Sequence, residues 1–177
     1  MIRIFDFLFS LIGLIFLSPL LVLIFFIGLF DSGLPLFIQS RVGYNLKSFS
    51  LIKFRTMPKG VRSVGTHLIK DIKLSSFGYF LRRTKLDEIP QLLNVLFGDM
   101  SLVGPRPCLF NQKKLINERK KRGVFKVRPG ITGLAQISDI NMKTPTLLAK
   151  TDQKMIKNMS LYKYFYYIFK TIFKIIK

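Results

Sequence analysis

Cysteine, histidine and tryptophan are almost absent from this sequence, whose 177 residues include one Cys (Cys108), one His (His67) and no Trp. A single cysteine excludes a disulfide framework and fits a reducing, cytosol-facing environment. Zinc sites need clustered Cys and His ligands, and the sequence has no such cluster. His67 has no partner at triad or metal spacing, so we interpret it as a solvated residue. No phosphate-binding Gly-x-x-x-x-Gly-Lys or Gly-x-Gly-x-x-Gly motif is present.

Acidic residues are also scarce, with 9 Asp and Glu against 29 Lys and Arg, a formal net charge of +20. The chain is nevertheless 49% hydrophobic. Disorder is therefore excluded as its main state, because disordered chains combine high charge with low hydrophobicity. The length suits one domain, and both apolar and anionic partners are expected. Charge alone would also permit nucleic-acid binding, but the apolar start of the chain argues against that class.

The longest apolar run, Ile4 to Phe30, is long enough to span a bilayer. Ser18-Pro19 interrupts it in the middle, and neither half alone could cross the hydrocarbon core. The run therefore predicts either a re-entrant helix that bends at Ser18-Pro19 and returns to the same side, or a kinked spanning helix. The serine hydroxyl can hydrogen-bond a carbonyl that the proline leaves free. Nearly all basic residues follow this run, so the rest of the chain is expected to face the cytoplasm.

The pattern after this run predicts a small α+β domain that is mostly helical, over residues 35–177, following a membrane segment over residues 1–34. Pro90 is tolerated in the first turn of a helix, which places the start of one helix near Asp87. The other expected elements are strands at 36–44 and 49–57, a surface loop at 58–76, helical segments at 77–98 and 111–128, and a turn at 128–133.

Residues 160–177 predict an amphipathic helix at the end of the chain. Its lysines fall on one stripe, and the other positions are mainly Tyr, Phe and Ile; the stripe consists of Lys163, Lys170, Lys174 and Lys177. A helix of this kind suits the interface of an anionic bilayer. The alternative is a helix that packs against the protein core.

The adjacent pair Asp87-Glu88 is conspicuous among so few acids. It lies at a predicted helix start, where a capping role is the structural alternative. Downstream, two prolines hold Arg106 in the stiff loop Gly104-Pro-Arg-Pro107, and a guanidinium fixed in this way can bind a phosphate with two hydrogen bonds. Further cations are available at Arg41, Lys53 and Arg55.

Two carboxylates among these cations predict a Mg²⁺-assisted phosphate-transfer site at the membrane. Mg²⁺ in proteins typically binds one or two carboxylates together with substrate phosphates and water. The residues alone do not name a substrate.

Five motifs then occur in order along the chain: Lys53-Phe-Arg-Thr-Met, Leu86-Asp-Glu-Ile-Pro-Gln-Leu, Asn94-Val-Leu, Gly98-Asp-Met-Ser-Leu-Val-Gly-Pro-Arg-Pro and Arg128-Pro-Gly-Ile-Thr-Gly. One of them alone would be weak, but the ordered set is specific. It resembles the bacterial sugar transferase family, in particular the small monotopic phosphoglycosyl transferases that begin polysaccharide and glycoprotein glycan assembly. The resemblance covers nearly the whole chain.

The resemblance implies a reaction in two steps. An aspartate attacks a nucleoside diphosphate sugar, for which the family suggests a uridine nucleotide, and releases the nucleoside monophosphate. Polyprenyl phosphate then attacks the aspartyl-phosphosugar and yields a polyprenyl diphosphate sugar. The implied location is the bacterial inner membrane, with the catalytic domain facing the cytoplasm.

The resemblance also implies roles for individual residues. Asp87 would be the nucleophile and Glu88 its neighbour, both associated with Mg²⁺. The phosphate-binding residues would be Arg106 and, by position, Arg82 and Arg55. We expect the helix start and nearby arginines to favour the ionised form of Asp87. Ser18-Pro19 matches the break of the family's re-entrant helix, which favours that topology.

The sequence departs from its relatives at two positions. Many relatives have a tryptophan where this chain has Leu134, and an arginine often associated with donor binding where it has Ile140. The departure leaves the donor sugar open. It also leaves an alternative function, a catalytically weakened membrane protein that acts through interactions. The intact residues Asp87, Glu88 and Arg106 favour an active enzyme.

Overall fold

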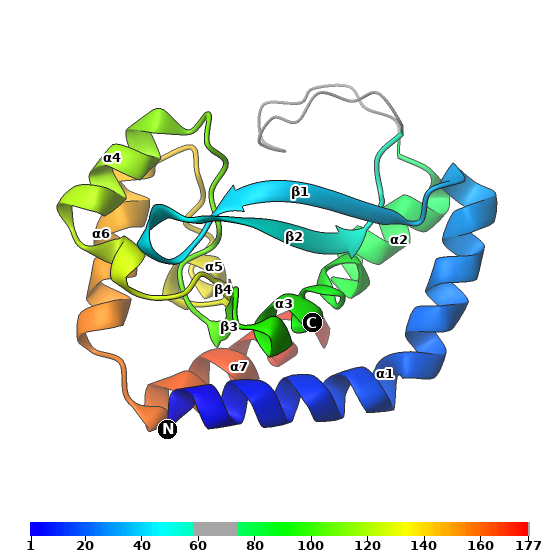
Figure 1. Ribbon diagram of the computed structural model, residues 1–177, viewed down its shortest axis with the longest axis horizontal. Coiled ribbons are helices and arrows are strands. Elements are labelled where there is room, and N and C mark those ends of the chain that lie inside the picture. Colours follow the sequence, from blue (N-terminus) through cyan, green and yellow to red (C-terminus); the bar gives the residue numbers. More distant parts are fainter. Residues whose placement is uncertain (59–73, 177) are drawn as a thin grey trace.

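The computed structural model describes residues 1–58 and 74–176 (Figure 1). The helices are α1 (Ile2–Ser32), α2 (Ser76–Arg83), α3 (Gln91–Phe97), α4 (Lys113–Lys121), α5 (Leu134–Ile137), α6 (Pro145–Lys157) and α7 (Leu161–Ile176). The strands are β1 (Leu36–Val42), β2 (Ser48–Phe54), β3 (Ser101–Val103) and β4 (Gly130–Thr132), and 3-10 turns lie at η1 (Tyr44–Leu46), η3 (Leu86–Glu88) and η4 (Val124–Lys126). The predicted α+β class with mostly helical content is confirmed. Most of the predicted loop at 58–76, with His67, lies outside the described residues.

The two predicted strands are confirmed as β1 and β2. They pair antiparallel as a hairpin, in a register that places Leu36 opposite Phe54 and Val42 opposite Ser48. The segment at 128–133 differs from the prediction, because it contains a strand, β4, which pairs in parallel with β3. The reason is a very close backbone approach. A Cβ on Gly130 would lie 2.0 Å from the Gly104 nitrogen, so only glycine permits this pairing.

Helix α1 is continuous but bends sharply about halfway along (Figure 1). Pro19 is its one internal proline and cannot donate the backbone hydrogen bond that Ile15 would otherwise accept. The Ser18 hydroxyl donates to this Ile15 carbonyl instead, at 2.8 Å. The bend therefore divides α1 into two arms, and the freed carbonyl has a partner, as predicted.

The first arm of α1 is fixed to the rest of the protein by polar contacts. Asp6 is 2% exposed, and its Oδ1 accepts hydrogen bonds from the Ser101 hydroxyl at 3.0 Å and the Leu102 amide at 2.9 Å. A third hydrogen bond comes from the Tyr164 hydroxyl at 2.9 Å. Arg3 donates to the carbonyl of Leu96 at 3.1 Å. A charged group in the apolar run thus joins α1 to both β3 and α7.

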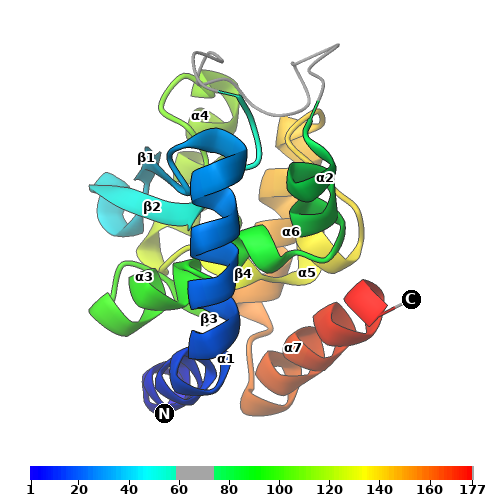
Figure 2. The ribbon, with the colours of Figure 1, turned by 90° about the vertical axis from the view of Figure 1, so that its right-hand side faces the viewer.

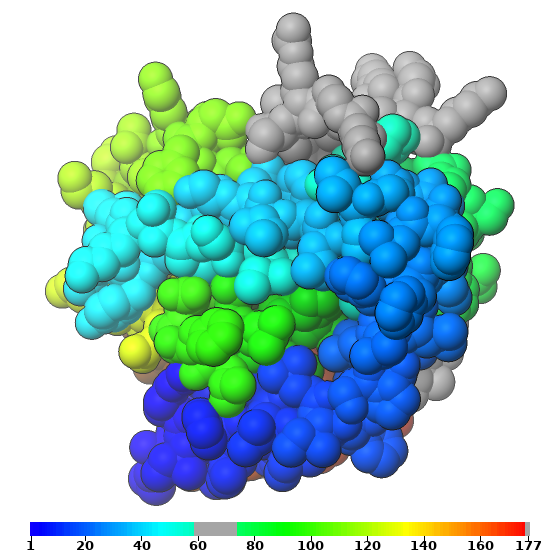
Figure 3. Space-filling view, turned by 45° about the vertical axis from the view of Figure 1, so that its right-hand side comes forward, coloured from blue at the N-terminus to red at the C-terminus, as the bar shows by residue number. Residues whose placement is uncertain are grey.

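The second arm attaches to the same body. Ile24 is buried in a cluster with Phe54 of β2 and Leu81 of α2. At the end of the arm, the Asp31 carboxylate accepts a hydrogen bond of 2.8 Å from Ser75, whose hydroxyl also caps α2. Figure 3 shows α3 (green) framed by the arms of α1 (blue). The outward sides of both arms expose large apolar residues, among them Phe7, Ile12, Phe16, Val22, Phe26 and Phe30.

Helix α7 has one face in the core and one face exposed. Tyr164 and Tyr167 are buried, and Phe165 makes edge-on contacts with the rings of Phe5 and Phe9 of α1, beside which α7 lies (Figure 2). The opposite side exposes Tyr162, Phe169 and Phe173. The predicted helix is confirmed, and the core-packing alternative holds for its inner face.

The three hydrogen bonds to Asp6 lead to a prediction about stability. Replacing Asp6 by Ala would leave the Ser101, Leu102 and Tyr164 donors without their acceptor, which should destabilise the fold by roughly 2–4 kcal/mol. We expect a clearly lower midpoint of thermal unfolding for Asp6→Ala than for the wild type, both held in nanodiscs. Asp31→Ala removes one exposed hydrogen bond and serves as the control, with an expected loss below about 1 kcal/mol. Equal midpoints for the two variants would contradict the anchoring role of Asp6.

Candidate active site

A buried asparagine places the acidic pair against the hairpin. Asn94 of α3 is 1% exposed, and its Oδ1 accepts from the Ile52 amide at 3.0 Å while its Nδ2 donates to the Ser50 carbonyl at 2.8 Å. One edge of β2 pairs with β1. At the other edge, the Asn94 carboxamide makes two of the backbone hydrogen bonds that a neighbouring strand would make. Because α3 is fixed there, the residues just before it, η3, lie against β2.

The acidic pair lies in the 3-10 turn η3 rather than in the first turn of α3, which begins only at Gln91. The prediction of a helix start near Asp87 was therefore wrong by about one turn. Pro90 has no N–H to donate to the Leu86 carbonyl, and the Ile89 amide makes that bond instead with 3-10 spacing, at 3.3 Å. Lys85 has a left-handed backbone (φ 59°), which turns the chain sharply between α2 and η3.

Asp87 is a buried carboxylate, 5% exposed, whose oxygens accept no hydrogen bond from any residue within 1–58 or 74–176. Burial and the neighbouring Glu88 raise the pKa of Asp87 to about 6, although Lys53, Lys85 and Arg82 act in the opposite direction. Arg82 favours the ionised form of Asp87, as expected of a nearby arginine, but desolvation outweighs it together with the two lysines. With a pKa of about 6, Asp87 is still mostly ionised at pH 7.

Glu88 differs from Asp87 because it has a direct partner. Its Oε1 lies 2.6 Å from Nη2 of Arg106, the arginine of the stiff proline loop. Burial alone would raise the pKa of Glu88, but the charge and the hydrogen bond of Arg106 lower it to about 2. Glu88 in turn raises the pKa of Arg106. The Arg106 side chain is 46% exposed. A guanidinium has five N–H donors, so the bond to Glu88 leaves others for a further ligand.

Two further cations reach the site from the hairpin. Lys53 of β2 lies opposite Phe37 of β1. Arg41 lies four residues after Phe37 on β1, so it is on the same face of the hairpin as Lys53. Burial lowers the pKa of Lys53, although Asp87 and Glu88 act in the opposite direction. Burial and the nearby Arg106 lower the pKa of Arg41 to about 10, and Arg41 also donates to the Pro107 carbonyl at 3.2 Å.

The remaining predicted phosphate ligands differ in placement. Arg82 lies close enough to affect the pKa of Asp87, and its Nε donates to the Thr56 hydroxyl at 2.8 Å. Arg55 is held elsewhere by hydrogen bonds to the carbonyls of Leu34 at 2.9 Å and Leu36 at 3.2 Å. The structure thus brings together Asp87, Glu88, Arg82 and Arg106, but it does not bring Arg55 to them.

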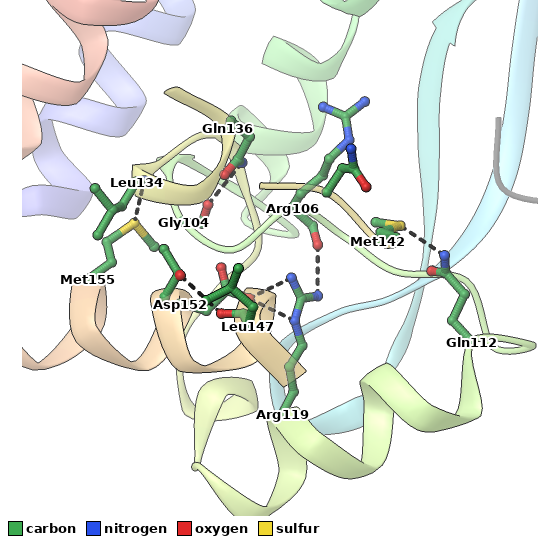
Figure 4. A network of polar contacts seen from close by, with 12 residues as sticks. Gly104, Arg106, Gln112, Arg119, Leu134, Gln136, Met142, Leu147, Asp152 and Met155 are labelled. Carbon is green, nitrogen blue, oxygen red and sulfur yellow. Dashed lines mark hydrogen bonds and ion pairs between the residues drawn. The ribbon is translucent and has the colours of Figure 1, made fainter. Parts of the chain in front are cut away.

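A buried ion pair that was not predicted from the sequence supports the Arg106 loop (Figure 4). Arg119 of α4 is 1% exposed and donates to the Arg106 carbonyl at 2.8 Å through Nη1. Its Nε donates to the fully buried Asp152 of α6 at 2.9 Å. The signal that could have found this pair is Asp152 itself, since it is one of only 9 acids and lies within a helix.

The two positions that depart from the family pattern lie among core residues. Ile140 packs against the cluster that contains Cys108 and Ala135. Leu134 packs against the cluster that contains Val103 and Met155. Both apolar side chains therefore have a packing role in this chain, whatever they replace.

The opposite pKa shifts of Asp87 and Glu88 predict opposite effects on stability. The folded pKa of Asp87 lies above its ordinary value of 3.8, so ionised Asp87 destabilises the fold above pH 6, by roughly 3 kcal/mol, and not below about pH 4. Asp87→Asn should therefore raise the unfolding midpoint at pH 7.5, with a gain that disappears by about pH 4. Glu88 stabilises the fold above pH 4.5, an effect lost as the pH falls towards 2.

Glu88→Gln should therefore lower the midpoint at pH 7.5, with a loss that disappears as the pH falls towards 2. Thermal unfolding of the two variants between pH 2 and 8 measures both effects. If Asp87→Asn lowered stability at pH 7.5, burial would not dominate the electrostatics of Asp87.

The sequence of this chain is similar to those of known proteins. A family profile described as bacterial sugar transferase matches residues 1–177. An uncharacterized sugar transferase of Haemophilus influenzae is 35% identical over 178 residues, which cover 91% of this chain and 38% of the relative. The exopolysaccharide production protein ExoY of Sinorhizobium fredii is 34% identical over 96% of this chain and 83% of its own length.

A third relative carries a more specific name. The UDP-glucose:undecaprenyl-phosphate glucose-1-phosphate transferase of Klebsiella pneumoniae is 38% identical over 97% of this chain but only 39% of its own length. The chain thus spans well under half of the Haemophilus and Klebsiella proteins. Since the family profile covers all 177 residues, the chain belongs to the bacterial sugar transferase family.

Proposed function

We propose that the protein transfers a sugar-1-phosphate from a UDP-linked sugar to polyprenyl phosphate through an aspartyl-phosphosugar intermediate. The observation that carries this proposal is Asp87, a buried carboxylate without a hydrogen-bond donor among the described residues and with Lys53, Lys85 and Arg82 near it. A carboxylate that no described residue engages in this way is available as a nucleophile. The name of the Klebsiella relative specifies a UDP-sugar and undecaprenyl phosphate, which supports this substrate class.

The proposed reaction uses one phosphorus atom twice. In the first step, an Asp87 carboxylate oxygen attacks the phosphorus that bears the sugar, and the bond from that phosphorus to the nucleoside monophosphate breaks. In the second step, a phosphate oxygen of polyprenyl phosphate attacks the same phosphorus and releases the Asp87 carboxylate. A water-soluble donor and a lipid acceptor can therefore react in turn without both being bound at once.

The cations of the site suit the charge of this reaction. Glu88 holds the Arg106 guanidinium, and Arg119 holds the Arg106 backbone carbonyl. The remaining guanidinium donors are therefore already oriented for a phosphate. The charges of Lys53 on β2 and Arg82 on α2 both lower the pKa of Asp87. We place Arg106 and Arg82 at the phosphates. Arg55 would join them only after leaving the Leu34 and Leu36 carbonyls.

The acidic pair also suits Mg²⁺. Among residues 1–58 and 74–176, no group of three or more acidic, His or Cys side chains could hold a metal, so the protein would supply Asp87 and Glu88 alone. No residue of the described ranges donates to the Asp87 oxygens, and substrate phosphates would complete the coordination. Bound Mg²⁺ would neutralise phosphate charge that develops in the reaction.

We further propose that α1 enters the membrane and returns to the same side. Its first arm contacts Leu96 and Ser101, and its second arm ends at Ser75, so both ends lie on the body that carries Asp87. A straight span would place one of these ends across the bilayer. By length and composition α1 could cross a membrane, but its bend and its two attachments favour the re-entrant path. The basic remainder of the chain favours the cytoplasmic side of the inner membrane.

A nucleotide-release assay tests the proposed reaction. Nanodisc-held protein with Mg²⁺, polyprenyl phosphate and a panel of UDP-sugars should release uridine monophosphate with one or two donors. Asp87→Asn should reduce this release by at least about 10³-fold, because it removes the nucleophile, while membrane insertion is retained. Asp31→Asn is the matched control, since it keeps the hydrogen-bond acceptor for Ser75 far from the site.

Full activity of Asp87→Asn would exclude Asp87 as nucleophile. No release from any donor, beside an active relative, would favour the alternative of a membrane-bound interaction protein.

Single cysteines test the topology. In a Cys108→Ala background, a cysteine inserted after Met1 and a second protein with Lys47→Cys, in the hairpin turn, should both react with a membrane-impermeant maleimide only from the cytoplasmic side. Reaction of the Met1 site from the periplasmic side would show that α1 spans the bilayer.

A further inference from the structure

The inner face of α7 continues beyond the buried tyrosines into two polar residues. Tyr164, Tyr167, Thr171 and Lys174 follow one another at intervals of three or four residues, so they share one face of the helix. The two tyrosines are buried in the core. The last two residues of the face therefore point towards the catalytic body and not to the exposed apolar side of α7.

Lys174 binds the end of α5. Its Nζ lies 2.5 Å from Oδ1 of Asp139 and donates to the carbonyls of Ile137 at 3.3 Å and Gln136 at 3.5 Å. Carbonyls in the last turn of a helix have no partner within the helix, and a lysine there satisfies them. Lys174 is thus engaged within the protein, whereas Lys170 of the same predicted stripe lies over the Tyr166 ring at 5.8 Å.

The contacts of Lys174 continue to the loop of Arg106. Gln136, whose carbonyl binds Lys174, donates through its side chain to the Gly104 carbonyl at 3.3 Å (Figure 4). On the other side of the same residue, the Gly104 amide donates to the Thr132 carbonyl at 2.8 Å. The Thr132 hydroxyl is hydrogen-bonded to the Thr171 hydroxyl of α7. Two short paths therefore join α7 to Gly104, two residues before Arg106.

We propose that Lys174 and Thr171 are positioning residues, which hold the Gly104–Pro107 loop through α5 and β4 and so orient Arg106. The proposal rests on the proposed function for its catalytic consequence, but its structural part stands on the contacts alone. Neither residue touches Asp87 or Glu88 in the described structure, so both would act through Arg106. The inner face of α7 would thus position the Arg106 loop, while its opposite face exposes apolar residues.

Hydrogen exchange in the loop tests the structural part. In the full-length protein in vesicles of anionic and zwitterionic lipid, Lys174→Met should speed amide exchange over residues 101–106 by about tenfold, because one path to Gly104 is lost. Lys170→Met is the matched control, with the same helix and charge change but no contact with α5, and should stay within about twofold of the wild type. Lys174→Arg can still donate to Asp139 and the carbonyls, and should restore slow exchange.

The nucleotide-release assay on the same four proteins tests the catalytic part. Lys174→Met should lower kcat/KM by about tenfold at an unchanged unfolding midpoint, and Lys174→Arg should recover most of it. Equal exchange in Lys174→Met and Lys170→Met would overturn the positioning role, whether or not the protein transfers sugar. Faster exchange with unchanged kcat/KM would overturn its link to catalysis. A wild type without any nucleotide release would instead refute the proposed function, and the exchange rates alone would then decide whether the loop is held from α7.

Discussion

The burial of two adjacent carboxylates in one turn is the constraint on which the rest of the site depends. Water cannot stabilise both charges there, so the protein must supply cations, and it supplies them unequally. Glu88 has Arg106 at 2.6 Å and a pKa near 2, whereas Asp87 has cations near it but no donor among the described residues and a pKa near 6. Glu88 is thereby held by a direct ion pair, whereas Asp87 has no such partner among the described residues.

Arg106 can serve this arrangement only if its loop is rigid. Arg119 holds the Arg106 carbonyl and is itself neutralised by Asp152. The close approach of Gly104 and Gly130 joins the loop to β4. Rigidity therefore comes from α4, α5, α6 and β4 together, so three helices and a strand support one loop. The conformational entropy of the arginine side chain is therefore lost when the protein folds and not when the substrate binds.

Local patterns predicted the elements and the acidic pair, but not the contacts that place them. The hairpin, α7 and the bend at Pro19 follow from spacing and from proline chemistry over a few residues. Asn94 binds residues 42 and 44 positions away, and Asp6 binds partners 95 and 158 positions away. No local pattern encodes such pairings. The direction of the net pKa shift of Asp87 was not predicted either. It depends on how deeply the turn is buried, which the sequence does not state.

The bent helix and the site meet a common requirement. In the proposed reaction a lipid phosphate stays at the membrane surface and a sugar nucleotide stays in water, so a single carboxylate would have to lie where both can reach it. A spanning helix would fix only one end to the catalytic body, and the body could tilt away from the surface. With one arm held by Asp6 and the other by Asp31, the body is held at two points. Because β3 carries one of these anchors and leads directly into the Arg106 loop, the proposed placement of the site at the membrane and the geometry of its arginine would depend on the same short strand.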